Sequence, residues 1–129
     1  MNLLPWIGLG SALGGTVRYA LDQIALGLGQ GLFPFSTLFV NLSGSLLIGF
    51  LAGCWSGQQI EPDRRHFWMT GVCGGYTTFS AFSLQVLQLI EDGQAIPAGV
   101  YAATSVGLGV IGVWVGLSLA RRRVKEEKI

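Results

Sequence analysis

GVCGGYTTFSAFS, residues 71–83, occupies the middle of an uncharged stretch that runs from residue 67 to residue 90. It contains two adjacent glycines, Gly74 and Gly75, and two adjacent threonines, all poor helix formers. Non-helical backbone inside a membrane is tolerated only where it is buried in protein or lines a cavity. Its freed carbonyls can then coordinate a small cation, as in the discontinuous helices of transporters. The segment therefore predicts a helix that is broken between Gly74 and Thr78.

Further uncharged stretches surround this segment, at residues 1–17, 23–60 and 93–120. Half of the 129 residues are hydrophobic and 12% are charged, whereas about 25% are charged in a soluble domain. A membrane-spanning helix needs about 20 apolar residues. We therefore predict an all-α integral membrane protein, a single domain over residues 1–129 with four transmembrane helices, the third broken at mid-membrane. The predicted spans are residues 3–20, 36–56, 67–90 and 96–120, with a loop at 26–35 and a basic tail at 121–129.

The charged and reactive residues exclude several classes of function. A net charge of +1 gives no reason to expect a nucleic-acid partner. None of the predicted spans contains Asp or Glu, and His66 lies in the charged loop before the third span. Cys54 and Cys73 fall inside predicted spans, where they are expected to be small buried side chains. The sequence offers no base, nucleophile or cluster of metal ligands for catalysis, so we predict that the protein is not an enzyme.

The basic residues are distributed unevenly between the two ends of the predicted spans. With four spans, one side of the membrane receives Arg64, Arg65, Arg121, Arg122, Arg123, Lys125 and Lys128. The opposite side receives only Arg18. The positive-inside rule then places both termini in the cytoplasm. The tail is expected to anchor this orientation, with binding to lipid headgroups as the second interpretation.

Small residues recur at intervals of four along three of the predicted spans. They include Gly10 with Gly14, Gly112 with Gly116, and the series Ser45, Gly49, Gly53 and Gly57. In lipid, such faces allow helix backbones to approach closely. Two interpretations stay open: packing within one chain, and a subunit interface.

Beyond the predicted break, Phe79 and Phe82 are three residues apart and share a helix face. Ser80 and Ser83 share another face in the same way. On spacing alone, a packed aromatic pair with hydroxyls bonded back to the helix explains the pattern well. Alternatively, these side chains line a pathway.

Three motifs in order resemble the signatures of one family, the bacterial fluoride channels of the Fluc type. The first is Gly74-Gly75-Tyr76-Thr77-Thr78-Phe79-Ser80-Ala81-Phe82-Ser83. Earlier in the chain, Gly14-Gly15-Thr16-Val17-Arg18-Tyr19 resembles Gly-Gly-x-x-Arg-Tyr, and residues 37–44 resemble Thr-(x)3-Asn-(x)2-Gly with Thr37, Asn41 and Gly44. The four-span layout also matches, so the resemblance covers nearly the whole chain.

The resemblance implies an antiparallel dimer with two narrow pores, each lined by both subunits. Its pore residues would be Phe79, Phe82, Asn41, Ser80, Thr37, Tyr101, Ser105 and Arg18, the last near the aqueous vestibule. The backbone carbonyls of Gly74 and Thr77 would bind a structural sodium ion at the dimer centre. A further hydroxyl common in the family one turn after Ser105 is replaced here by Gly109, which leaves the polar track shorter.

The residue types suit a small, strongly hydrated anion. Amide and hydroxyl donors and the positive edges of phenyl rings can replace water around fluoride. The absence of Lys and Arg deep in the spans suits conduction, because a tight ion pair would hold the ion. We therefore expect passive export of fluoride through the inner membrane of a bacterium, by a homodimer or a heterodimer with an oppositely oriented homologue. The alternatives are a small four-helix multidrug exporter, whose membrane glutamate is missing here, and an assembly subunit that transports nothing.

Overall fold

Helices account for most of the chain in the computed structural model, which describes residues 2–129 and contains no strand among them. Three helices are continuous: α1 (Leu4–Gly27), α2 (Phe35–Cys54) and α6 (Ala95–Glu127). The segment between α2 and α6 consists of α3 (Pro62–Arg65), the π-helix η1 (His66–Cys73), α4 (Gly74–Tyr76) and α5 (Phe79–Glu91). Together these four elements form one interrupted helical leg. The chain is thus all-helical, in the four-part layout that the uncharged stretches predict.

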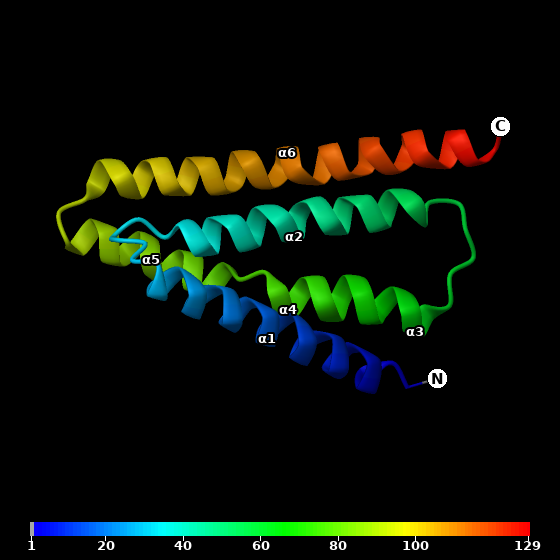
Figure 1. Cartoon of the computed structure of the whole chain (residues 1–129), viewed down its shortest axis with the longest axis horizontal. Helices are drawn as coiled ribbons and strands as arrows, with labels where there is room; N and C mark the ends of the chain where they lie inside the picture. The colour runs from blue at the N-terminus through cyan, green and yellow to red at the C-terminus, as the bar shows by residue number, and fades with distance from the viewer. Residues whose placement is uncertain (1) are drawn as a thin grey trace.

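The elements pack mainly as two pairs (Figure 1). α2 lies along α6, and α1 lies along η1 and α4, with little contact between α1 and α2. α5 crosses over to contact α6 at the end of the bundle opposite the termini. Because the interrupted leg contacts α1 before its break and α6 after it, the break lies where the chain passes from one pair to the other.

Glycines allow the helices of each pair to approach at backbone distance. A Cβ added at Gly49 would overlap the backbone of Val113, and one at Gly116 would overlap the backbone of Leu46. In the other pair, a Cβ at Gly10 would lie 2.9 Å from the Cα of Gly71. These contacts are within one chain. Packing within the chain therefore accounts for the small residues at these positions, whereas Gly57 lies beyond α2 and packs against no other element.

Two helices continue further than the sequence predicts. α1 ends at Gly27 and not at residue 20, so it takes in Asp22 and the start of the expected loop. α6 continues to Glu127, so most of the basic tail is helical, and α6 is about 50 Å long at 1.5 Å per residue. Charged residues in the last turns do not end a helix, because their side chains reach solvent while the backbone bonds stay intact.

The reversal from α5 into α6 is a tight helix end closed by Gly93. Its φ of 74° is a left-handed conformation that favours glycine. The N–H of Gly93 donates to the Ile90 carbonyl (3.0 Å), and the N–H of Gln94 donates to the Leu89 carbonyl (2.8 Å). This turn fixes the start of α6 close to α5.

α2 and α6 are long and apolar enough to cross a membrane. The third predicted span is divided among shorter elements, none of which has that length alone.

Candidate functional site

The helical backbone between α4 and α5 is interrupted at Thr77 and Thr78, which have extended conformations. Thr77 has φ −81° and ψ 156°, and Thr78 has φ −147° and ψ 124°. Gly74 and Gly75, which the sequence predicts to be part of the break, are helical in α4. The break is therefore present, but the two threonines form it, as suits residues with high preference for extended backbone.

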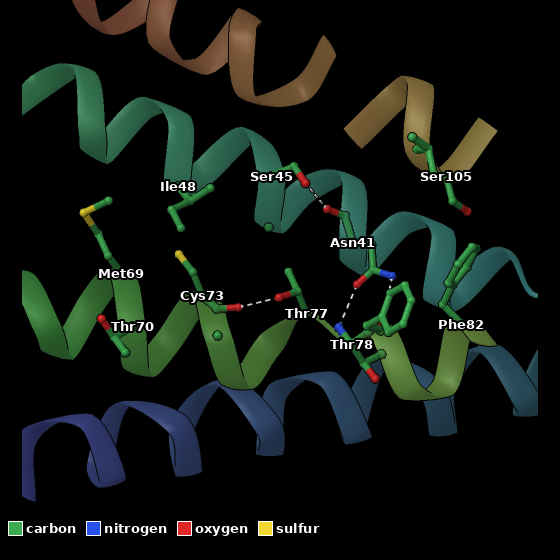
Figure 2. A pocket seen from close by; sticks show the side chains of 14 residues that line it. Asn41, Ser45, Ile48, Met69, Thr70, Cys73, Thr77, Thr78, Phe82 and Ser105 are labelled. Atoms are coloured by element: carbon green, nitrogen blue, oxygen red, sulfur yellow. Dashed lines mark hydrogen bonds between the residues drawn. The ribbon is translucent and has the colours of Figure 1, made fainter. Parts of the chain in front are cut away.

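Asn41 of α2 binds the backbone of Thr78 on both sides. Its Oδ1 accepts from the Thr78 N–H at 2.8 Å, and its Nδ2 donates to the Thr78 carbonyl at 3.0 Å (Figure 2). In a continuous helix, that N–H would donate to the carbonyl of Gly74. The side-chain amide thus replaces the acceptor that the break removes from the Thr78 N–H, and it adds a donor to the carbonyl with which α5 begins.

The first turn of α5 is capped by its own side chain. Thr78 Oγ1 accepts from the N–H of Ala81 at 3.2 Å, which is the usual bond of a threonine at an N-cap. In a continuous helix, this N–H would reach the Thr77 carbonyl. Both Gly74 and Thr77 therefore lack their usual helical donors, and their carbonyl oxygens are among those that become available at the break.

Arg18 of α1 lies beside the same break. Its Nε donates to the carbonyl of Gly75 at 3.5 Å, a carbonyl that a continuous helix would pair with the N–H of Phe79. Arg18 is half-buried there and is not among the residues that line the groove described next. Its contact ties α1 to the break.

An open groove of about 550 Å³ lies between the two helix pairs at the level of the break. Figure 2 shows side chains of α2, η1 and α5 and Ser105 of α6 around it. Most of its lining is apolar, with a few polar groups among the apolar ones. Among its lining residues are Asn41, Gly74, Thr77, Phe79, Phe82 and Ser105. The groove therefore brings together both predicted phenyl rings, the predicted amide, one predicted hydroxyl and both predicted carbonyl residues.

The two phenyl rings differ in their surroundings. Phe79 is 79% exposed, although it is a large apolar side chain. Phe82 lies between Phe79 and Tyr101, with ring centroids 5.7 Å and 5.2 Å away respectively. The pair is therefore in contact, but only Phe82 is packed by this chain, and Phe79 needs other atoms to cover it.

Ser105 presents a hydroxyl with no protein partner. Its Oγ is shielded from solvent and has no hydrogen-bond partner among the described residues. Asn41 also keeps one N–H beyond the one it gives to Thr78. A shielded polar group without a partner is costly, and it commonly marks the place of a missing ligand or water.

Thr37 and Tyr101 are buried behind the groove and are joined by Gln85. The Tyr101 hydroxyl donates to Gln85 Oε1 at 2.8 Å, and Gln85 Nε2 donates to Thr37 Oγ1 at 2.9 Å. Tyr101 is fully buried and Thr37 is 4% exposed. The network links α2, α5 and α6, and Phe82 packs on its tyrosine ring.

Sequence reasoning did not identify Gln85, although a signal was available. Gln85 is three residues after Phe82 and so lies on the same face of α5, and it is polar within a predicted membrane span. Ser80 is exposed and is not among the groove-lining residues, and its hydroxyl lies 3.3 Å from that of Thr78. The structure thus places Ser80 beside the cap of α5.

The chain is similar to one described protein family and to several named proteins. The profile of the family described as "CrcB-like protein, Camphor Resistance (CrcB)" matches residues 5–117. A protein of Bradyrhizobium diazoefficiens named "Fluoride-specific ion channel FluC 1" is 47% identical over 123 residues, which are 93% of this chain and 85% of that protein. "Fluoride-specific ion channel FluC" of Rhizobium meliloti is 46% identical over 125 residues, 96% of this chain and 100% of that protein. The protein of the same name from Flavobacterium psychrophilum is 39% identical over 122 residues, 94% of this chain.

Proposed function

The chain belongs to the CrcB-like family, and on this basis we propose that it is a fluoride-selective channel through which fluoride leaves the cytoplasm passively. Relatives that match almost its full length are named as fluoride-specific ion channels. Its function is accordingly conduction of an ion and not catalysis. The observation that supports the proposal most directly is the shielded, unpartnered hydroxyl of Ser105 in the same groove as the phenyl pair.

The groove can offer hydrogen-bond donors to a fluoride ion, and no Lys or Arg is among its lining residues. Ser105 has a free hydroxyl hydrogen, Asn41 has a free N–H, and the rings of Phe79 and Phe82 have partly positive edges. The N-terminal turn of α5, which carries the positive end of a 13-residue helix, also lies at the groove. Such groups can replace water around a small anion and still release it. Larger halides would be excluded by width and by donor spacing.

The groove is open on one side, so we propose that a second subunit completes the pathway. Phe79, which is 79% exposed, would then be covered by the partner. An antiparallel pair would place each subunit's phenyl rings against the polar residues of the other, giving two pores in the inner membrane of a bacterium. α2 and α6 meet the length requirement for crossing the bilayer, and we propose that α1 and the interrupted leg cross it with them.

The carbonyls of Gly74 and Thr77 suit a sodium ion at the dimer centre. Both have lost their helical donors to Asn41 and Thr78, and no side chain lies within 4 Å of a Cβ added at Gly74. Oxygen ligands of this kind are those that hard cations prefer. When bound, sodium would supply a positive charge that attracts the carbonyls of both subunits. Asn41 and Thr78 would keep those carbonyls free of helical hydrogen bonds.

Purified protein in liposomes loaded with potassium fluoride tests the proposed function. A potassium ionophore releases the counter-charge, and a fluoride electrode records efflux. We expect rapid fluoride release and no chloride release from matched potassium chloride liposomes. Fluoride release no faster than from protein-free liposomes would refute the proposal. A multidrug exporter would instead need a carboxylate for its cationic substrate, and no Asp or Glu is among the residues that line this groove.

A further inference from the structure

A second cavity lies at the end of the bundle that carries both termini, apart from the groove. Its volume is about 350 Å³, and its lining comes from the start of α1 and from the turn that leads through α3 into η1. The lining residues are Trp6, Glu61, Asp63, Arg64, Phe67 and Trp68. None of them lines the groove, so the cavity is independent of the proposed pathway.

The cavity combines indole rings with both signs of charge. Trp6 and Trp68 are 44% and 40% exposed, and the ring of Phe67 meets that of Trp68 edge-on at 5.3 Å. Glu61 and Asp63 supply carboxylates on the same turn as the guanidinium of Arg64. The ion pair in the described part of the chain is Arg123 with Glu127, on the α6 tail, so the charges of the cavity are free for a ligand.

Asp63 needs a hydrogen-bond donor that the protein does not supply. Its Oδ1 is shielded from solvent and has no partner among residues 2–129. A shielded carboxylate oxygen is stabilised by a cationic donor more than by a neutral one. Indole faces attract the same kind of group, because ammonium ions bind over aromatic rings. Arg64, which also lines the cavity, suits a phosphate.

We infer that this cavity binds the headgroup of an aminophospholipid, with the primary ammonium at Asp63 and the tryptophan rings, and the phosphate at Arg64. Lipid is the source that the position indicates, because tryptophan is enriched at the membrane interface and the basic residues of this end lie at headgroup level. Such a lipid would hold the start of α1 against the α3 turn.

Competition among lipids with identical acyl chains tests the inference. The purified protein is mixed in detergent with equal amounts of ethanolamine, choline and glycerol phospholipids, and the retained lipid is counted by native mass spectrometry. The choline group keeps the positive charge and the attraction to the rings but has no N–H to donate to Asp63. We expect the ethanolamine lipid to be retained about tenfold over the choline lipid, the difference that one charge-assisted hydrogen bond produces. Equal retention of all three lipids would overturn the inference and leave a cavity for water or small ions.

Matched variants locate the effect. Asp63→Asn should abolish the preference for ethanolamine over choline, whereas Glu126→Gln on the exposed α6 tail should keep it. Trp68→Leu should lower retention of both the ethanolamine and the choline lipid, whereas Trp114→Leu, which removes an exposed indole of α6 outside the cavity, should not. An unchanged preference in Asp63→Asn would contradict the assignment.

A series of N-methylated ethanolamine lipids gives the same answer without a variant. Retention by the unmodified protein should fall most when the third methyl group removes the last N–H, because one donor is enough for Asp63 while the charge stays. Fluoride efflux from liposomes that contain the variants shows that they are folded, since none of these residues lines the groove.

Discussion

Asn41 and Thr78, 37 residues apart in the chain, are joined by two hydrogen bonds between a side-chain amide and a backbone. The amide accepts from the N–H that a continuous helix would have paired with Gly74, and it donates to the carbonyl with which α5 begins. Asn41 on α2 thus stabilises the helix break at Thr78 in the neighbouring segment. The same amide keeps one N–H for the groove, so its role in the fold and its proposed role toward fluoride are linked.

Replacing Asn41 by Ala should therefore reduce both stability and conduction. The Thr78 N–H would lose its acceptor, and an unsatisfied buried group costs about 1–3 kcal/mol. We expect the free energy of unfolding in detergent to fall by about 2 kcal/mol or more and fluoride efflux to be lost. Thr104→Ala is a matched control, because the Thr104 hydroxyl bonds only within α6, to the Val100 and Tyr101 carbonyls. Normal stability of Asn41→Ala would show that the break does not depend on the amide.

The buried network of Thr37, Gln85 and Tyr101 should behave as one unit. Tyr101→Phe and Thr37→Val each remove one hydroxyl with little change of shape, and each leaves one group of Gln85 without a partner. We expect each change to destabilise the protein by about 1–2 kcal/mol. The double variant should lose less than the sum, by on the order of 1 kcal/mol, since both act through one glutamine. Strict additivity in a double-mutant cycle measured by denaturant titration would refute the network.

The sequence predicted the helical class and the presence of a break, because uncharged stretches and helix-breaking residues are local properties. It placed the break partly on Gly74 and Gly75, whereas the structure opens at the threonines. The reason is a contact across the fold: a Cβ at Gly75 would lie 2.7 Å from the Cα of Ser11, so this glycine serves close packing on α1. A sequence motif alone does not reveal whether a glycine is required for a helix break or for close packing of two helices.

For the candidate site, too, the sequence predicted some features and missed others. The resemblance identified residues of the groove, and several of them do lie together. It could not show that Asn41 is already bonded to Thr78, or that Thr37 and Tyr101 meet through Gln85. These relations join residues 16 to 48 positions apart, and helical periodicity carries no information about such pairs.

Substitution of Phe79 and of Phe82 should affect the stability of the subunit differently. Phe82→Ile removes a ring packed 5.2 Å from that of Tyr101, whereas Phe79→Ile changes a ring that this chain leaves 79% exposed. Both variants should cut fluoride efflux sharply, because an aliphatic side chain has no positive ring edge. Only Phe82→Ile should also destabilise the isolated subunit, by about 1–3 kcal/mol. Normal efflux from both variants would remove the proposed role of the rings.

Gly74 and Gly75 are adjacent, yet alanine should act on them differently. At Gly75 an added methyl group overlaps the Ser11 backbone, so Gly75→Ala should destabilise the subunit itself, by about 1–3 kcal/mol. At Gly74 nothing lies within 4 Å, so the subunit should fold normally. If Gly74 lies at the centre of a dimer that binds sodium, Gly74→Ala should instead weaken the dimer. Replacing sodium by N-methylglucamine should weaken the unmodified dimer too, as size-exclusion chromatography coupled to light scattering would show. Dimers indifferent to both changes would argue against the sodium site.

Orientation in the membrane is where charge and family resemblance lead in different directions. An antiparallel dimer of one chain requires copies inserted both ways, which a strong charge bias opposes. Here the basic residues at the end with both termini outnumber Arg18 seven to one. α6 continues as a helix to Glu127, so the basic tail forms a rigid projection that directly follows the apolar part of the helix.

We predict that this chain alone inserts mainly with both termini in the cytoplasm, and that its antiparallel partner is either a minority of inverted copies or an oppositely biased homologue. A tag at the C-terminus, probed with impermeant reagents from each face of the membrane, measures the two populations. Cytoplasmic labelling well above periplasmic labelling is expected. Changing Arg121, Arg122 and Arg123 to Gln should then bring the two populations closer together, since these residues flank the span closely enough to act during insertion. Equal labelling of the unmodified chain from both faces would show that the charge bias does not set its orientation and that one chain makes the whole dimer. Labelling from the cytoplasmic face alone, with full fluoride efflux and no second subunit, would exclude the antiparallel arrangement for this protein.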